Sequence, residues 1–93
     1  MPILSFKCVE TQRLFTTGQT RRFTSFQRVA ERKLAQLDAA VTLAFLRSPP
    51  GNRLEALSGD RQGQHSLRIN DQWRLCFVWT EQGAINVEIV DYH

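Results

Sequence analysis

Hydrophobic residues in the first half of the chain recur every three or four positions, the spacing of a helix with one buried face. The clearest stripe consists of Phe26, Ala30, Leu34, Leu37, Val41 and Phe45. Thr24 and Gln27 have the form of a capping box at its start, and Pro49-Pro50-Gly51 ends it because proline removes an amide donor. The pattern predicts one long helix between Thr24 and Pro49, with the stripe in the core.

Two shorter elements are predicted before this helix. Val9, Leu14 and Phe15 follow a looser helical spacing, and Gly18 is suited to the C-terminus of a short helix. The apolar run at residues 3–6 predicts a first strand.

Beyond residue 60 the spacing changes to that of strands. Three runs rich in β-branched and aromatic residues, at 65–70, 73–80 and 85–92, are separated by turn-length breaks. Short breaks favour antiparallel neighbours. The sequence therefore predicts an α+β fold of order β-α-α-β-β-β, with the sheet packed against two N-terminal helices, and residues 1–93 form a single domain.

Composition limits the class of protein further. The 93 residues are 42% hydrophobic and 23% charged, which is typical of a globular chain. No apolar run approaches the roughly 20 residues of a membrane span, and the first residues lack the pattern of a signal peptide. We expect a cytoplasmic protein with no membrane association.

Charge is unevenly distributed. Residues 1–54 carry nine basic and three acidic groups, a net charge of +6, whereas residues 55–93 have a net charge of −3. Ten of the twelve basic residues are arginine, whose planar fork suits bidentate contact with phosphate. A polyanionic partner and an ordinary solvated helix surface explain this charge about equally well.

Cysteine usage indicates neither a metal centre nor a disulfide scaffold. Cys8 and Cys76 lie far apart and have no partners at metal-ligand spacing. We expect two buried free thiols, with a lone disulfide as the alternative, and no metal or cofactor.

The short turns allow the strand register to be predicted. A turn near residue 82 places Arg74 opposite Asp91, within a residue or two, and the turn at 70–72 places Arg68 opposite Arg74. Two opposed arginines repel unless a carboxylate or a bound anion lies between them. Asp91 could fill that place structurally, and a phosphate could fill it functionally.

The sequence ends in Asp91-Tyr92-His93, which combines a carboxylate, a phenol and an imidazole beside the arginine pair. Histidine titrates near neutrality, and arginine can stabilise charge that develops on a phosphate. The set therefore fits acid–base chemistry on a phosphodiester. The alternative is a solvated tail, since chain ends are often disordered.

Several motifs in combination resemble the HigB toxins of bacterial type II toxin–antitoxin systems, which belong to the RelE/ParE superfamily. The motifs are Ser5-Phe6-Lys7-Cys8, the segment from Pro50 to Arg61, Ile69-Asn70-Asp71-Gln72-Trp73-Arg74, and the terminal Asp91-Tyr92-His93. The resemblance extends over nearly the whole chain and implies a compact RelE-like domain.

The resemblance also implies an activity, that of a ribosome-dependent mRNA endonuclease that works in the A site without a metal. Arg74 would stabilise the transition state, Tyr92 would orient or stack the substrate, and His93 with Asp91 would transfer protons. The implied RNA contacts are Arg53, Glu55, Arg61, Arg68 and Asn70. Some relatives have histidine and lysine where Glu55 and Ser58 stand here, so activity could be weaker or the proton route could run through Glu55.

The implied partners are a helix-turn-helix antitoxin of the HigA type, the 70S ribosome and mRNA, with operator DNA bound only through the antitoxin. Two other functions remain open at this point. One is a ParE-like toxin that inhibits DNA gyrase and cleaves nothing. The other is a weakly active or silent partner that serves mainly to complete a repressor with its antitoxin.

Overall fold

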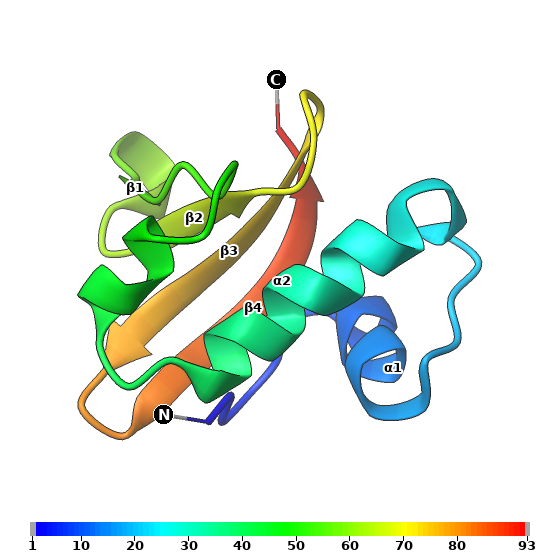
Figure 1. Ribbon diagram of the computed structural model, residues 1–93, viewed down its shortest axis with the longest axis horizontal. Helices are drawn as coiled ribbons and strands as arrows, with labels where there is room; N and C mark the ends of the chain where they lie inside the picture. The colour runs from blue at the N-terminus through cyan, green and yellow to red at the C-terminus, as the bar shows by residue number, and fades with distance from the viewer. Residues whose placement is uncertain (1, 93) are drawn as a thin grey trace.

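A four-stranded antiparallel sheet forms the centre of the molecule. The computed structural model describes residues 2–92. The strands are β1 (Glu55–Ala56), β2 (His65–Arg68), β3 (Trp73–Thr80) and β4 (Gly83–Asp91), and they lie side by side in chain order (Figure 1). The three strands expected beyond residue 60 are confirmed as a meander. The two-residue β1 was not predicted, because two residues show no periodicity.

Two helices cover one face of this sheet. Helix α2 (Gln27–Ala39) crosses β3 and β4, and α1 (Val9–Thr17) packs beside it against β4 (Figure 1). Large buried side chains from both layers meet between them: Leu14, Phe23, Leu34, Leu37, Leu67, Leu75, Phe77 and Ile89. The predicted α+β class, with two helices ahead of the sheet, is confirmed. Among residues 2–92, no helix is long and apolar enough to cross a membrane.

The N-terminal segment lies along β4 but does not form the continuous strand that we predicted. It makes two isolated parallel bridges, Ile3 with Ala84 and Phe6 with Val87. Between them Asn86 has a φ of 54° and breaks the regular backbone of β4. Gly83 permits the close approach, because a Cβ there would stand 2.1 Å from the Pro2 carbonyl oxygen.

The predicted long helix is divided into three pieces. A 3-10 turn, η1 (Thr24–Phe26), precedes α2, and a second, η2 (Leu43–Arg47), follows it. The backbone leaves the helix at Ala40 (ψ 129°), and the Thr42 hydroxyl accepts from the Phe45 amide and caps η2. Val41 and Phe45 are consequently 74% and 48% exposed, so their predicted place in the core was wrong.

The predicted capping box is also absent. The Thr24 hydroxyl donates to the Thr20 and Arg21 carbonyls, and the Gln27 amide donates to the Gly18 carbonyl (2.7 Å). The capping hydroxyl belongs to Thr20, which accepts from the Phe23 amide at 3.0 Å. The chain thus turns into the helix about one turn earlier than the sequence pattern suggested.

Candidate functional site

The register of the sheet decides which side chains can meet on its outer face, the face opposite the helices. Arg68 pairs directly with Arg74, as predicted. On the other side Arg74 pairs with Val90, and Asp91 pairs with Trp73. The predicted Arg74–Asp91 pairing was therefore off by one residue, which is within the tolerance of the prediction. Because paired residues share a face, Arg74 belongs to the outer face and Asp91 to the face of Trp73.

Arg74 and Tyr92 meet at the end of this outer face. The Arg74 Cζ atom lies 5.6 Å from the centroid of the Tyr92 ring, in cation–π geometry. Two guanidinium nitrogens of Arg74, Nε and Nη1, are buried and have no hydrogen-bond partner among residues 2–92. The Tyr92 amide donates to the Gln72 carbonyl at 2.7 Å, which fixes the backbone of Tyr92 at the end of β4. Arg74 thus offers a desolvated positive charge, whose interaction with an anion is stronger than in water.

Arg68 stands opposite Arg74 and is partly neutralised by a neighbour. Its Nη2 donates to the Asp71 carboxylate in the turn between β2 and β3. The Asp71 side chain is 99% exposed, whereas that of Arg68 is 25% exposed. An ion pair this open to water is weak, so the Arg68 guanidinium remains available to an incoming anion.

A second cationic group lies further along the outer face. The 3-10 turn η3 (Gly59–Arg61) brings Arg61 over the sheet, where Nη1 lies 3.4 Å from the Glu88 carboxylate. Lys7 Nζ approaches the same carboxylate at 3.7 Å. The Glu88 side chain is only 15% exposed, so it ties η3 and the N-terminal segment to β4. With Arg68 and Arg74, the outer face gathers four cations against the carboxylates of Glu88 and Asp71.

Cys76 lies on the same outer face, where it pairs with Glu88 across β3 and β4. Burial raises the pKa of its thiol to about 11, and Glu88 raises it further against the opposing effects of Arg61 and Arg74. The thiol is therefore protonated and unreactive at neutral pH. The expectation of two buried free thiols is confirmed for Cys76, whereas Cys8 is free and only half-buried.

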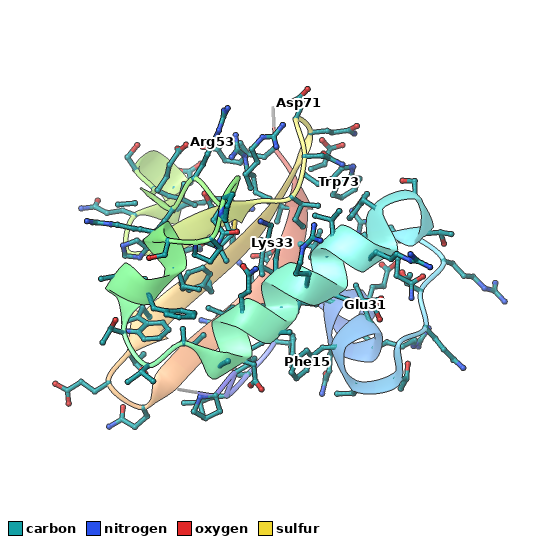
Figure 2. All side chains as sticks on the ribbon, viewed as in Figure 1. Phe15, Glu31, Lys33, Arg53, Asp71 and Trp73 are labelled. Atoms are coloured by element: carbon teal, nitrogen blue, oxygen red, sulfur yellow. The ribbon has the colours of Figure 1, made fainter. Side chains whose placement is uncertain are left out.

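The other residues predicted to contact RNA lie around this face in different settings. The Asn70 side-chain oxygen accepts from the Gln72 and Trp73 amides, both at 2.9 Å, and so shapes the β2–β3 turn. Arg53 is exposed and points outward at the same end of the molecule as Asp71 (Figure 2). Glu55 is exposed on β1, opposite Ser66. His93 lies outside the described residues.

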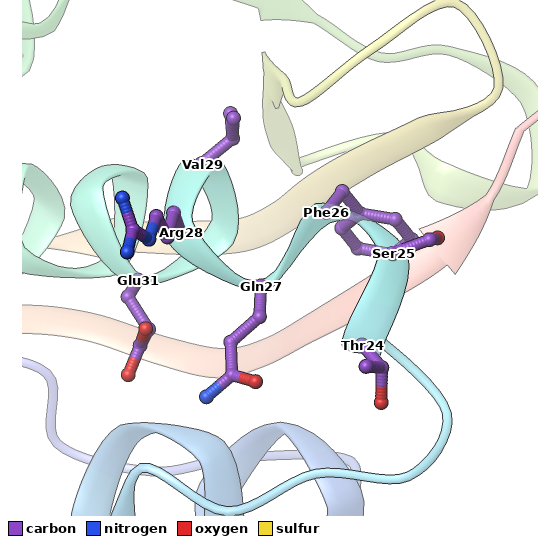
Figure 3. Close-up of a pocket in the computed structure, with 7 residues that line it drawn as sticks. All are labelled: Thr24, Ser25, Phe26, Gln27, Arg28, Val29 and Glu31. Carbon is purple, nitrogen blue, oxygen red and sulfur yellow. The ribbon is translucent and has the colours of Figure 1, made fainter.

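A hollow of about 500 Å³ at the start of α2 is separate from all of these residues. It is lined by residues 24–29 and Glu31. Gln27 and Glu31 point from α2 toward α1, so this hollow belongs to the helical layer (Figure 3). None of the predicted site residues lines it.

Our sequence reasoning missed a buried polar pair next to the arginines. Lys33 of α2 is 5% exposed, and its ammonium donates to the side-chain oxygen of Asn52, which is fully buried. Burial, followed by the nearby charges of Arg32 and Arg68, lowers the pKa of Lys33. One signal was present, since Lys33 falls on the same stripe as Ala30 and Leu37.

Comparison with known proteins places the chain in a family. A family model described as "RelE-like toxin of type II toxin-antitoxin system HigB" matches residues 4–93. Toxin HigB-1 of Vibrio cholerae is 39% identical over 85 residues, which cover 89% of this chain and 90% of that toxin. An uncharacterized protein of Haemophilus influenzae is 36% identical over 66 residues, covering 71% of this chain and 64% of that protein.

Two helices on one face of a small antiparallel sheet, together with these matches, define a RelE-like toxin of a type II toxin–antitoxin system. Within that class, the chain belongs to the HigB family. Membership of this family implies an antitoxin partner.

Proposed function

We propose that this toxin is a ribosome-dependent endoribonuclease that cleaves mRNA in the A site without a metal, and that residues 1–93 act as a single domain. The observation that carries the proposal is the position of Arg74, which stands opposite Arg68 with two desolvated, unpartnered nitrogens and the Tyr92 ring 5.6 Å away. This arrangement suits a phosphate with an attached base, because the guanidinium attracts the anion and the ring can stack on the base.

In the proposed reaction the 2′-hydroxyl of the mRNA attacks the adjacent phosphorus. The hydroxyl loses its proton to a base, the bond to the 5′-oxygen of the next nucleotide breaks, and that oxygen gains a proton. The products are a 2′,3′-cyclic phosphate and a free 5′-hydroxyl. We assign the proton transfers to His93 with Asp91 and the stabilisation of the charged phosphorane to Arg74.

The remaining residues of the outer face would hold the RNA. Arg53, Arg61 and Arg68 supply charge for backbone phosphates, and Tyr92 supplies a stacking surface. Glu55 and Asn70 lie at the border of this surface and offer polar contacts. Asp91 lies on the Trp73 side of the sheet by register, so we assign it a supporting role with His93 rather than direct contact with the phosphate.

We further propose a HigA-type helix-turn-helix antitoxin as the cytoplasmic partner, with operator DNA bound only through it. The ribosome would supply the in-line placement of the mRNA that cleavage requires. Contact with ribosomal and messenger phosphates would make the activity depend on salt.

Mapping mRNA 5′ ends after brief induction of the toxin tests this function. New ends within translated codons are expected while ribosomes are active, and none when translation is blocked. Cuts that persist without translation would contradict ribosome dependence. His93→Ala should relieve growth arrest. Arrest by a His93→Ala toxin, without new RNA ends, would favour inhibition of DNA gyrase.

Arg74 offers a sharper test of the site. Arg74→Ala should lower the cleavage rate by about 10²–10³-fold, the usual effect of removing one donor to a developing oxyanion. Arg74→Lys keeps the charge but loses the planar fork, so its cleavage rate should lie between those of the wild type and Arg74→Ala. Both variants should fold, since no hydrogen bond of Nε or Nη1 within residues 2–92 is lost. Equal rates for all three proteins would remove Arg74 from the mechanism.

A further inference from the structure

Lys33 occupies an unusual place for a charged residue. It lies in the middle of α2, 5% exposed, between core residues Ala30 and Leu34. Burying an ammonium group is costly unless it is hydrogen-bonded or paired with a charge. No carboxylate forms an ion pair with Lys33 in the described part of the chain, and its partner is the neutral amide of Asn52. A leucine at this position would pack without that cost, so the lysine needs another explanation.

The Asn52 side chain takes part in three hydrogen bonds. Its oxygen accepts from Lys33, and its Nδ2 donates to the Gln36 side-chain oxygen at 3.1 Å and to the Leu46 carbonyl at 3.0 Å. Gln36 lies one helical turn beyond Lys33 on α2, and Leu46 lies in η2. The side chain of one residue therefore joins the helix to the segment that follows it.

The backbone of Asn52 extends this connection to the sheet. Its amide donates to the Pro49 carbonyl at 3.3 Å, and its carbonyl accepts from the Arg68 amide at 2.7 Å. The next residue, Arg53, has a φ of 45°, a backbone conformation that few non-glycine residues adopt without support from their surroundings. Two of the arginines at the outer face, Arg53 and Arg68, thus depend on where Asn52 is held.

Lys33 itself is buried, and it lies near the centre of the molecule in Figure 2. Arg53 is fully outside and points away from it (Figure 2). The lysine therefore acts on the arginines through Asn52 and the turn that contains it.

We propose that Lys33 is a positioning residue for the outer face of the sheet: its hydrogen bond to Asn52 fixes the Pro49–Arg53 turn between η2 and β1 and so sets the places of Arg53 and Arg68. The functional part of this inference rests on the proposed ribonuclease activity. The structural part, that Lys33 controls local order at Arg68, does not.

The test compares Lys33→Met with Leu34→Ala. Methionine keeps the length and burial of the side chain but removes its donors, which leaves the Asn52 oxygen unsatisfied. Leu34→Ala creates a cavity at a fully buried neighbour in the same helix and removes none of the hydrogen bonds of the Asn52 side chain, so it controls for a general loss of stability. Both full-length proteins are purified and followed by amide hydrogen exchange and by cleavage of mRNA on ribosomes.

For Lys33→Met, we expect the Arg68 amide to exchange about tenfold faster or more relative to the amides of β3. Leu34→Ala should accelerate the exchange of the Arg68 amide and of the β3 amides by the same factor. In the cleavage assay Lys33→Met should raise KM for the ribosome-bound message more than it lowers kcat, whereas Leu34→Ala should change neither per folded molecule. Proportional exchange in both variants would overturn the inference.

The two readouts separate the proposals. If the wild-type protein cleaves nothing, the ribonuclease assignment fails, but the exchange of Arg68 still tests the role of Lys33. If Lys33→Met does not fold, Gln36→Ala replaces it, because that change removes an acceptor of Asn52 and leaves Lys33 in place. Selective acceleration at Arg68 would support positioning by Asn52, and its absence would contradict it.

Discussion

Arg68 and Arg74 stand directly opposite one another on β2 and β3. Like charges in such a cross-strand pair are destabilising by a few tenths of a kcal/mol or more. Each arginine has separate compensation, Arg68 from the Asp71 carboxylate and Arg74 from the Tyr92 ring. The fold therefore tolerates the pair without being stabilised by it, in keeping with the RNA-binding role that we propose for the two arginines.

Arg68→Ala should leave stability unchanged or raise it by up to about 0.5 kcal/mol, because it removes the opposed charge at the cost of one exposed ion pair. RNA binding should weaken, and its dependence on salt should fall by about 0.7 in log–log slope for one lost phosphate contact. Urea unfolding and RNA titrations at several salt concentrations measure the two effects. A large loss of stability would mean that Arg68 is needed mainly for folding.

Glu88→Gln should tighten RNA binding. The carboxylate engages Arg61 and Lys7, and its neutralisation leaves both cations free to bind phosphate. Binding should also become more sensitive to salt. Glu81→Gln is the matched control, since it makes the same change of charge at an exposed turn between β3 and β4. If both variants bind RNA equally, net charge alone explains the effect.

Cys76 should contribute a pH-dependent part of the stability. Its pKa in the folded protein is about 11, above the usual value of 9.0, because burial disfavours the thiolate. The folded state therefore holds this proton more tightly, and the contribution is complete below about pH 9 and is lost as pH rises toward about 11. Urea unfolding between pH 8 and about 11 measures it.

Cys76→Ala is the control for these unfolding measurements. Without the thiol, stability should fall less steeply between pH 9 and about 11. A thiol reagent at neutral pH should modify the half-buried Cys8 long before Cys76. Rapid reaction of Cys76 in the folded protein would show that the structure around this buried thiol opens readily.

Thr11→Val should destabilise the protein by about 1–3 kcal/mol. The fully buried Thr11 hydroxyl accepts from the Ile89 amide at 3.0 Å and thereby joins α1 to β4. Valine has nearly the same shape but leaves that buried amide without its acceptor. Thr16→Val is the control on an exposed face of the same helix, where the hydroxyl donates only to the Gln12 carbonyl. Similar costs for both variants would argue against the link.

Sequence periodicity predicted the parts of the fold that alternate regularly. Strand β3 has the predicted bounds Trp73–Thr80, and the Arg68–Arg74 pairing followed from a short turn. The predicted pairing of β3 with β4 was off by one residue because the turn begins earlier than expected, with Thr80 opposite Gly83. The irregularity between Cys76 and Val78 then moves the register by one residue, toward the predicted pairing. A bulge of this kind is caused by packing on both faces, and no turn residue announces it.

The helical half shows a different limit. The stripe continued through Val41 and Phe45, but the helix ended at Ala39 without a glycine or proline. The backbone leaves the helix at Ala40, and Thr42 caps the separate turn η2 that follows. A threonine beside hydrophobic positions is a weak signal of such a cap. Likewise, Lys33 was visible on the buried stripe, but its partner Asn52 lies 19 residues away and requires the fold to be known.

The bridges from Ile3 and Phe6 to β4 have a consequence for biosynthesis. Residues 3–6 find their neighbours in a strand that is made some eighty residues later, and the hydrogen bond from the Asn86 amide to the Ser5 hydroxyl joins positions 81 apart. Until residues 83–91 emerge, this segment has no strand to pair with, and α1 lacks the strand it packs against, whereas α2 can already pack on β3. The N-terminal segment therefore reaches its folded position only after β4 has been made.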